Sequence, residues 1–258
     1  MNYNYHTHTA RCGHASDAER DYIETAIAAG IKHMGFSDHM PFLFPNGRES
    51  ESDYRIPVML AEDYFKTLHA LREEYKDKIR LHIGFEMEYY PNCFQEMLAY
   101  AKGLGAEYLI LGQHFLDERE DVNVRPSKLT ESEETLKTYT DCVVAAIESG
   151  VFTYVAHPDL CRFVGADSIY YRETARLLDA ARQTKTPLEI NFLGIRDGRH
   201  YPMEKFWKLA GEFRVPVTFG FDAHDAEAAG DLTSLPRAME LVEKYNLNYI
   251  GEPTLKKI

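Results

Sequence analysis

The sequence predicts an α/β protein, and three observations carry this prediction. Short apolar runs of strand length recur along the 258 residues, stretches with helical period separate most of them, and chemically capable polar residues follow nearly every run. Alternating strands and helices indicate a parallel sheet. The polar residues favour a barrel over an open sheet, because only a barrel brings the carboxyl ends of all its strands to one mouth.

Seven runs are candidate strands, and they cover residues 2–5, 33–37, 81–85, 108–112, 152–156, 187–191 and 217–221. Helical patterns lie between most of them. A capping-box pattern at residues 16–19 precedes a run that stops at Gly30. Apolar residues fall on one helical face within residues 60–75 and again within residues 136–147. We therefore expect helices at these three places.

Length and composition predict a single domain covering residues 1–258. Barrels of this size are common, and 45% hydrophobic with 27% charged residues is ordinary for a protein with a sizeable core. A long insert follows the second run, at about residues 40–58. Loops of that length inside a compact domain are usually functional or disordered, so we expect this insert to act as a lid over the barrel mouth.

The charge balance limits the partners of the chain. A net charge of −12 argues against a nucleic-acid partner, and a phosphate ester must be drawn in by a local positive centre. No apolar run is long enough to cross a bilayer and no targeting pattern is visible, which predicts a cytoplasmic location without membrane contact. The four cysteines lack CxxC spacing and are expected to be free thiols. Oligomeric state has no signal in the sequence.

Imidazoles and carboxylates follow the predicted strands. His6 and His8 end the first run, and side chains two apart on a strand point the same way and can share one metal ion. This HxH pair alone is weak evidence, and so is the Asp38-His39 pair after the second run. The remaining runs supply further candidates, namely Glu86, His114, His157, Asp222 and His224. So many strand ends with ligand chemistry predict a metal centre.

This pattern resembles that of the polymerase-and-histidinol-phosphatase (PHP) family, which has HxH near the N-terminus, a downstream His, S-D-H, G-x-E, a strand-end His, H-P and D-x-H. The resemblance spans His6 to His224. It implies a distorted seven-stranded βα barrel that holds three divalent metal ions, for which zinc, manganese and iron all suit the ligands. The implied ligand sets are His6, His8, Glu86 and Asp222 for one ion, His14, His39 and His224 for the second, and Glu86, His114 and His157 for the third.

Such a cluster would give an acidic protein its positive centre. Three divalent ions outweigh two carboxylates, and water bound to such ions becomes acidic enough to supply hydroxide near neutral pH. We expect in-line attack of this hydroxide on phosphorus, with no need for a serine or cysteine nucleophile.

Within the family, the size of the chain, which leaves no room for an appended polymerase domain, favours hydrolysis of L-histidinol phosphate in histidine biosynthesis. Glu88 and Phe42 are candidates for recognising the amine and the imidazole of this substrate. The alternatives are a PHP phosphoesterase acting on a nucleoside monophosphate or an oligonucleotide end, and a metal-binding domain without turnover.

Basic residues near the later strand ends are candidates for binding phosphate. Arg162 is expected to be the clamp, followed by Arg196 and Arg199, because the arginine fork matches phosphate oxygens. The leaving alkoxide must be protonated, which requires a general acid. His200 is the leading candidate, and Asp38 is either a second candidate for the acid or a residue that orients a metal ligand.

Overall fold

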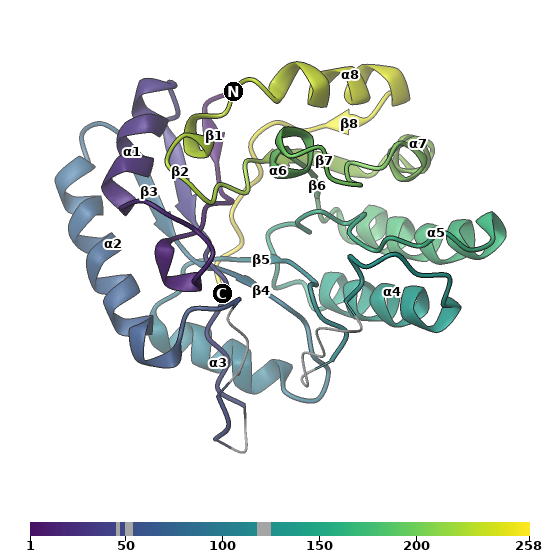
Figure 1. Cartoon of the computed structure of the whole chain (residues 1–258), viewed down its shortest axis with the longest axis horizontal. Coiled ribbons are helices and arrows are strands. Elements are labelled where there is room, and N and C mark those ends of the chain that lie inside the picture. The colour runs from purple at the N-terminus through teal and green to yellow at the C-terminus, as the bar shows by residue number, and fades with distance from the viewer. Residues whose placement is uncertain (45–46, 50–53, 118–124) are drawn as a thin grey trace.

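The computed structural model describes residues 1–44, 47–49, 54–117 and 125–258. Its strands are β1 (Tyr3–Asn4), β2 (His33–Phe36), β3 (Arg80–Ile83), β4 (Phe85–Met87), β5 (Leu109–Leu111), β6 (Leu188–Asn191), β7 (Pro216–Gly220) and β8 (Asn248–Tyr249). Its α-helices are α1 (Glu19–Ala28), α2 (Ala61–Tyr75), α3 (Phe94–Leu104), α4 (Glu133–Glu148), α5 (Asp167–Thr184), α6 (Phe192–Arg196), α7 (Glu204–Phe213) and α8 (Leu235–Tyr245). Short 3-10 turns are η1 (Ala10–Cys12), η2 (Val58–Leu60) and η3 (Ala228–Gly230). The longer helices lie around the strands (Figure 1).

The strands pair in parallel, as the alternation of strands and helices predicts. They form the groups β1-β2-β3, β4-β5 and β6-β7-β8. Single parallel bridges lie between residues at the edges of these groups, and they join His39 to Glu86, Leu111 to Val155, Val155 to Leu188 and Thr7 to Ala223. These bridges place the carboxyl ends of strands from both halves of the chain side by side.

Two predicted strands differ in extent from the structure. The run 152–156 is reduced to a short segment between β5 and β6, in which Val155 is bridged to Leu111 on one side and to Leu188 on the other, and the backbone nitrogens of Thr153 and Ala156 donate hydrogen bonds to β5. The run 81–85 is divided between β3 and β4 at Gly84. A Cβ added at Gly84 would lie 2.2 Å from the backbone oxygen of Tyr108, just before β5, so only glycine allows this close approach.

The predicted helices are present as α1, α2 and α4, but one cap is not as predicted. The capping box at residues 16–19 is wrong, because Ala18 is the N-cap of α1 and its side chain makes no capping hydrogen bond. In α4, the hydroxyl of Ser132 does accept a hydrogen bond from the backbone nitrogen of Thr135, at 3.2 Å. Such a cap satisfies one of the donors that the first helical turn leaves open.

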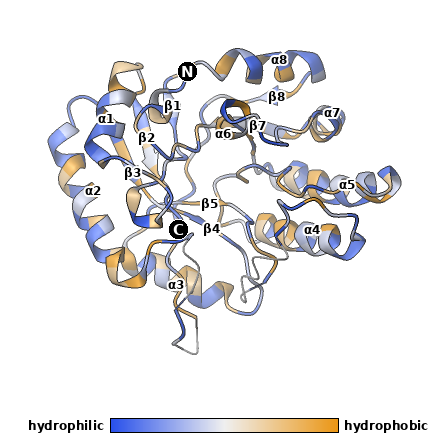
Figure 2. Ribbon diagram, viewed as in Figure 1, coloured by the Kyte–Doolittle hydropathy of each residue, from blue (hydrophilic) through white to orange (hydrophobic). Residues whose placement is uncertain are grey.

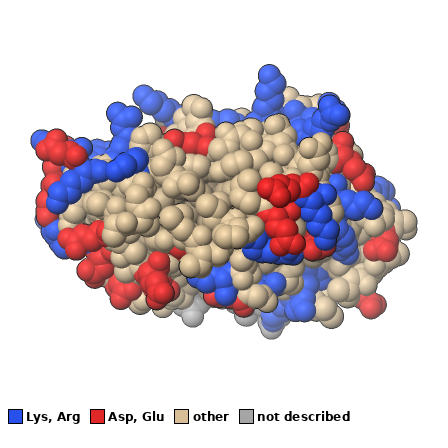
Figure 3. Space-filling view, turned by 90° about the horizontal axis from the view of Figure 1, so that it is seen from above, with Lys and Arg blue, Asp and Glu red and all other residues tan. Residues whose placement is uncertain are grey.

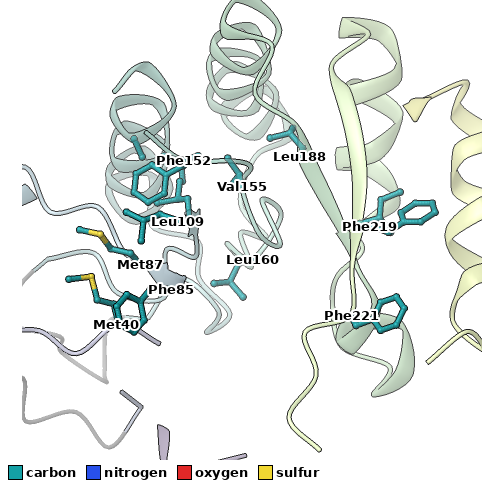
Figure 4. Packing of buried hydrophobic residues seen from close by; sticks show 14 of the residues in the cluster. Met40, Phe85, Met87, Leu109, Phe152, Val155, Leu160, Leu188, Phe219 and Phe221 are labelled. Atoms are coloured by element: carbon teal, nitrogen blue, oxygen red, sulfur yellow. The ribbon is translucent and has the colours of Figure 1, made fainter. Parts of the chain in front are cut away.

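Strand residues alternate between two apolar clusters. Leu109 and Leu111 belong to the larger cluster, which lies between strands and helices, whereas Ile110 belongs to the smaller one. The helices turn hydrophobic faces to the larger cluster (Figure 2), and Phe219 on β7 and Phe221 just after it project to the same side (Figure 4). The smaller cluster consists of Tyr3, Tyr5, Tyr108, Ile110, Tyr154 and Ala156. Burial of both strand faces is typical of parallel sheets covered by helices.

The insert predicted as a lid lies partly outside the described residues, which omit residues 45–46 and 50–53. In its described part, Phe42 and Phe44 are buried, and Leu43 pairs with Glu49 in an antiparallel bridge. None of the helices in the described ranges has the length and apolar character of a membrane span. On the face shown in Figure 3, basic and acidic side chains surround a largely uncharged area.

Candidate metal and phosphate site

Eight of the nine predicted metal ligands meet in four groups at the carboxyl ends of the strands. Within each group the potential ligand atoms lie within 4.8 Å of one another. The groups are His8-His39-His224, His6-His8-Asp222, His6-Glu86-His157 and His39-Glu86-His114. Because they share members, they form one continuous cluster of donors.

Glu86 on β4 lies at the centre of this cluster. Its two carboxylate oxygens lie 3.1–3.6 Å from ring nitrogens of five histidines, which are His6, His8, His39, His114 and His157. A Cβ at Gly112, directly after β5, would come within 1.9 Å of Glu86 Oε1, so glycine at this position leaves room for the carboxylate where it lies. Glu86 is therefore placed where one carboxylate can serve two ions.

Asp222 is the second carboxylate of the cluster. Its Oδ1 lies 3.2 Å from His8 Nε2, 3.4 Å from His6 Nε2 and 3.3 Å from His224 Nδ1. The backbone of Asp222 has a φ of +49°, a value that residues other than glycine rarely adopt. Such a conformation at a cluster of functional groups indicates that the surrounding structure holds it in place.

His14 lies at the edge of the cluster, outside the four groups. Its Nε2 is 3.1 Å from Nε2 of His224, and its ring centroid is 5.1 Å from that of His39. The structure thus brings together the three histidines that the family resemblance implies for the second ion. Two imidazole nitrogens that face each other across this gap can share a proton or a cation.

The chemistry of these donors fits divalent cations. His6 Nε2, His8 Nε2 and both oxygens of Glu86 are buried and have no hydrogen-bond partner within the described part of the chain. Buried polar atoms are normally paired, so these atoms are arranged for a group that binds them. Although burial lowers the pKa of His6, the carboxylates of Asp222, Glu189 and Glu86 raise it to about 10. These carboxylates attract positive charge, which metal ions would supply.

A cavity of about 770 Å³ lies over this cluster. Its floor contains seven of the predicted ligands, namely His14, His39, Glu86, His114, His157, Asp222 and His224. Its wall contains all the basic residues predicted for phosphate or proton transfer, which are Arg162, Arg196, Arg199 and His200. Buried His6 and His8 lie beneath the floor.

The three arginines predicted to bind phosphate differ in whether their guanidinium groups are already paired with a carboxylate. Arg196 forms an ion pair with Asp231 at 2.9 Å and also donates to backbone oxygens after β7. Arg199 pairs with Asp197 at 3.0 Å. Arg162 is exposed and makes no ion pair or side-chain hydrogen bond with any residue that the structure describes. Arg162 is thus the arginine of the three that is free to bind a ligand.

Arg125 also lines the cavity, and sequence analysis missed it. Its guanidinium carbon lies 4.1 Å from the ring centroid of Tyr54 and 4.8 Å from that of Phe115. Its Nε is buried and has no hydrogen-bond partner in residues 1–44, 47–49, 54–117 and 125–258. Because Arg125 follows no predicted strand end, the motif pattern has no signal for it.

Comparison with known proteins identifies the family. A family profile described as "PHP domain" matches residues 4–192, which is well over half of the chain. The chain belongs to the PHP family. The motif resemblance is therefore confirmed.

Two relatives of similar length are both named histidinol-phosphatase. The histidinol-phosphatase of Bacillus subtilis is 27% identical over 256 residues, covering 87% of this chain and 94% of the relative. That of Lactococcus lactis is 25% identical over 254 residues, covering 93% and 90%. A crystal structure of the L. lactis histidinol phosphate phosphatase with zinc, L-histidinol and phosphate has a TM-score of 0.71 at 21% identity, covering 96% of this chain and 95% of that chain. This similarity supports the α/β fold.

Glu189 on β6 supports the PHP site from below, and sequence analysis missed it as well. One of its oxygens lies 2.9 Å from His6 Nδ1, and the other accepts hydrogen bonds from the Asn191 side chain at 2.7 Å and the His157 backbone at 3.3 Å. Its side chain is fully buried. The signal in the sequence was an acidic residue inside an apolar run, residues 188–190.

We expect Glu189→Gln to weaken metal binding by about 10- to 100-fold, because a carboxylate behind a ligating histidine fixes its tautomer and raises its basicity. Metal retained against increasing chelator, measured by elemental analysis, tests this expectation. Glu173→Gln is a matched control, because Glu173 is also buried but lies on α5 and pairs with Arg172 and Arg176. Equal metal retention in both variants would contradict the role of Glu189.

Asp38 is fully buried beneath the PHP site. Its Oδ2 accepts hydrogen bonds from the backbone and the hydroxyl of Thr9, at 3.0 and 2.5 Å. Its Oδ1 accepts from the backbone of His39 at 2.8 Å and lies 3.3 Å from His8 Nδ1. Asp38 does not line the cavity, so this geometry favours the orienting role over that of general acid.

The substrate contacts predicted for Glu88 and Phe42 require correction. Both side chains are buried and neither lines the cavity. Glu88 pairs with Arg55 at 2.6 Å and with His114 Nδ1 at 3.1 Å, so it orients a candidate ligand. Phe42 packs beneath the guanidinium of Arg55, at 4.3 Å, and beside Tyr90. Both residues contact the buried Arg55 and not the cavity.

Proposed function

We propose that this chain is a metal-dependent phosphomonoesterase that converts L-histidinol phosphate to L-histidinol and phosphate, as histidine biosynthesis requires. The observation that carries the proposal is the cavity itself, in which imidazole and carboxylate donors form the floor and Arg162 on the wall is free to bind phosphate. The relatives named histidinol-phosphatase in two bacteria support the choice of substrate.

The proposal includes three divalent ions, held by the nine ligands as the PHP resemblance implies. The four donor groups and the adjacent His14 support this number, with Glu86 shared between sets. Divalent ions bound there would offset the charge of the phosphate and acidify a water molecule near neutral pH. The zinc in the L. lactis structure favours zinc, and manganese and iron remain alternatives.

The protein's own residues hold the substrate. The planar guanidinium of Arg162 can bind two phosphate oxygens at once. Arg196 and Arg199 contribute their charge from fixed positions, because their guanidinium groups are occupied by Asp231 and Asp197. The chain as a whole carries a net charge of −12, so these arginines, together with divalent ions when bound, would concentrate the attraction for phosphate at one cavity.

His200 remains our candidate for the proton donor to the leaving oxygen. Its Nε2 lies 2.8 Å from the carbonyl oxygen of Leu160 and donates to it, so Nδ1 is the atom left to face a ligand. Burial and the charge of Arg162 lower the pKa of His200 in the free protein. A bound phosphate dianion opposes the effect of Arg162 and favours the protonated imidazole.

We expect His200→Ala to lower kcat by about a hundredfold, the scale of general acid catalysis, with bound metal unchanged. Turnover of histidinol phosphate as a function of pH, with metal content measured on the same samples, tests this. A mutant that keeps the wild-type kcat, or loses metal in proportion to its activity, would remove His200 from the role of proton donor.

We also infer that the strands form a distorted seven-stranded βα barrel within a single domain of residues 1–258. The bridges at Val155 and between Thr7 and Ala223 support closure of the barrel, with the segment around Val155 as one of its seven strands. The insert at residues 40–58 is proposed as a lid, supported by Tyr54, which lines the cavity 4.9 Å from the ring of His14.

The decisive experiment measures inorganic phosphate released from L-histidinol phosphate by metal-reconstituted protein, beside a nucleoside monophosphate and a phosphodiester. We expect preference for histidinol phosphate and its loss after chelator treatment, restored by adding metal. Activity on the other substrates alone would keep the metal site and reject this substrate. Tight metal binding without any turnover would indicate a metal-binding domain.

A further inference from the structure

A second cavity, of about 690 Å³, lies at the opposite end of the strands from the metal ligands. It is lined at the start of β3 by Arg80, at the end of α2 by Arg72, before β5 by Glu107, and near the C-terminal end by Leu255 and Lys257. Glu86 lies six residues along the strand direction from Arg80, which corresponds to roughly 20 Å. This cavity is therefore separate from the proposed active site.

Positive charge dominates this second cavity although the chain is acidic. Its cationic side chains are Arg72, Lys76, Arg80 and Lys257, and the carboxylate side chain among its lining residues is Glu107. Glu107 is already engaged, because it pairs with Arg72 and lies 3.7 Å from Nδ1 of His82. Arg80 and Lys257 are exposed and form no ion pair with a carboxylate among the residues described. Within the described part of the chain, two cations thus line the cavity without a carboxylate side chain paired to either of them.

Apart from His82, the rest of the lining is apolar. The apolar lining residues are Ile79, Leu81, Ala106, Leu255 and Ile258. Leu255 also packs against the smaller apolar cluster. The segment that carries Leu255 runs to the middle of the strands in Figure 1 and is fixed by a hydrogen bond from the backbone of Lys256 to Thr153, at 3.1 Å. A cavity of this volume is large enough to bury most of a small organic molecule.

We propose that this second cavity binds a small organic anion with an apolar body, such as an aryl or alkyl carboxylate, sulfonate or phosphate. The anionic group pairs with Arg80 and Lys257, and the body lies against Leu81 and Leu255. Inorganic anions lack the body and neutral apolar molecules lack the charge, so both bind more weakly. This site is independent of the histidinol phosphatase activity.

The test uses 8-anilinonaphthalene-1-sulfonate as the probe and N-phenyl-1-naphthylamine as its uncharged analogue, both followed by fluorescence. We expect saturable binding of the sulfonate to the full chain, and binding about tenfold weaker in the double variant Arg80→Ala, Lys257→Ala. The uncharged analogue binds weakly to both proteins. Circular dichroism and thermal melting check that the variant is folded.

The matched control removes two positive charges elsewhere, with Lys66→Ala on α2 and Lys208→Ala on α7, both exposed and outside the cavity lining. It is expected to bind the sulfonate within twofold of wild type. The proposal is overturned if the wild type shows no saturable binding, if both double variants lose affinity equally, or if the uncharged analogue binds as tightly as the sulfonate.

Discussion

Glu86→Gln is expected to lower kcat for histidinol phosphate by about a thousandfold, because the loss of a shared ligand removes several kcal/mol of stabilisation by metal. Both oxygens of Glu86 face histidine nitrogens, and an amide replaces one of these acceptors by a donor. Burial alone would raise the pKa of Glu86, but His114, His6 and His39 hold it well below its usual range, so the native group is an anion. Glutamine cannot supply that charge.

The measurement combines elemental analysis of bound metal with steady-state kinetics on the same preparation. Glu86→Gln should lose both metal and activity, and excess metal in the assay should restore little of the rate. Glu173→Gln on α5 again serves as the control, with unchanged metal and rate. A Glu86→Gln protein that binds the wild-type amount of metal and turns over normally would reject Glu86 as the central ligand.

Arg162→Ala is expected to reduce kcat/KM for histidinol phosphate by roughly a hundredfold, the scale observed when one donor to a developing anion is removed. Metal content should stay at the wild-type level, because Arg162 lies on the cavity wall rather than in the ligand cluster. Arg162→Lys should recover only part of the loss, since lysine supplies charge without the planar fork. His114→Ala, by contrast, should lose metal.

Arg199→Ala provides the comparison for this prediction. Arg199 lines the same cavity but is paired with Asp197, so its removal should cost much less than that of Arg162. Steady-state kinetics of the three arginine variants under one set of metal conditions decide between them. If Arg199→Ala and Arg162→Ala have equal effects, ion pairing in the free protein does not identify the phosphate clamp.

The metal cluster could be predicted because its chemistry repeats at strand ends. His6, His39 and His157 each follow an apolar run, and parallel strands bring such ends to one place. The family motifs then predicted how these ligands are divided among three metal ions. The cytoplasmic location and the lack of nucleic-acid partners stay predictions from composition.

The residues behind the cluster were harder to predict, because their roles depend on contacts between distant strands. Glu189 acts on His6 across 183 positions of sequence, and Glu88 is turned away from the cavity by Arg55, which comes 33 positions earlier. No local pattern specifies such partners. The segment at residues 152–156 was predicted as a full strand, and in the structure it is a short one, with Val155 bridged on both sides and Thr153 and Ala156 hydrogen-bonded to β5.

The bridge between Thr7 and Ala223 has a consequence for how the protein is made. His14 and His224 face each other across 210 positions of sequence, so a nascent chain on the ribosome lacks part of the donor set until almost all of it has emerged. Contacts of such long range make folding slow, because a large loop must close before they stabilise the chain. Metal capture is therefore expected to be a late, post-translational event that locks the two ends of the chain together.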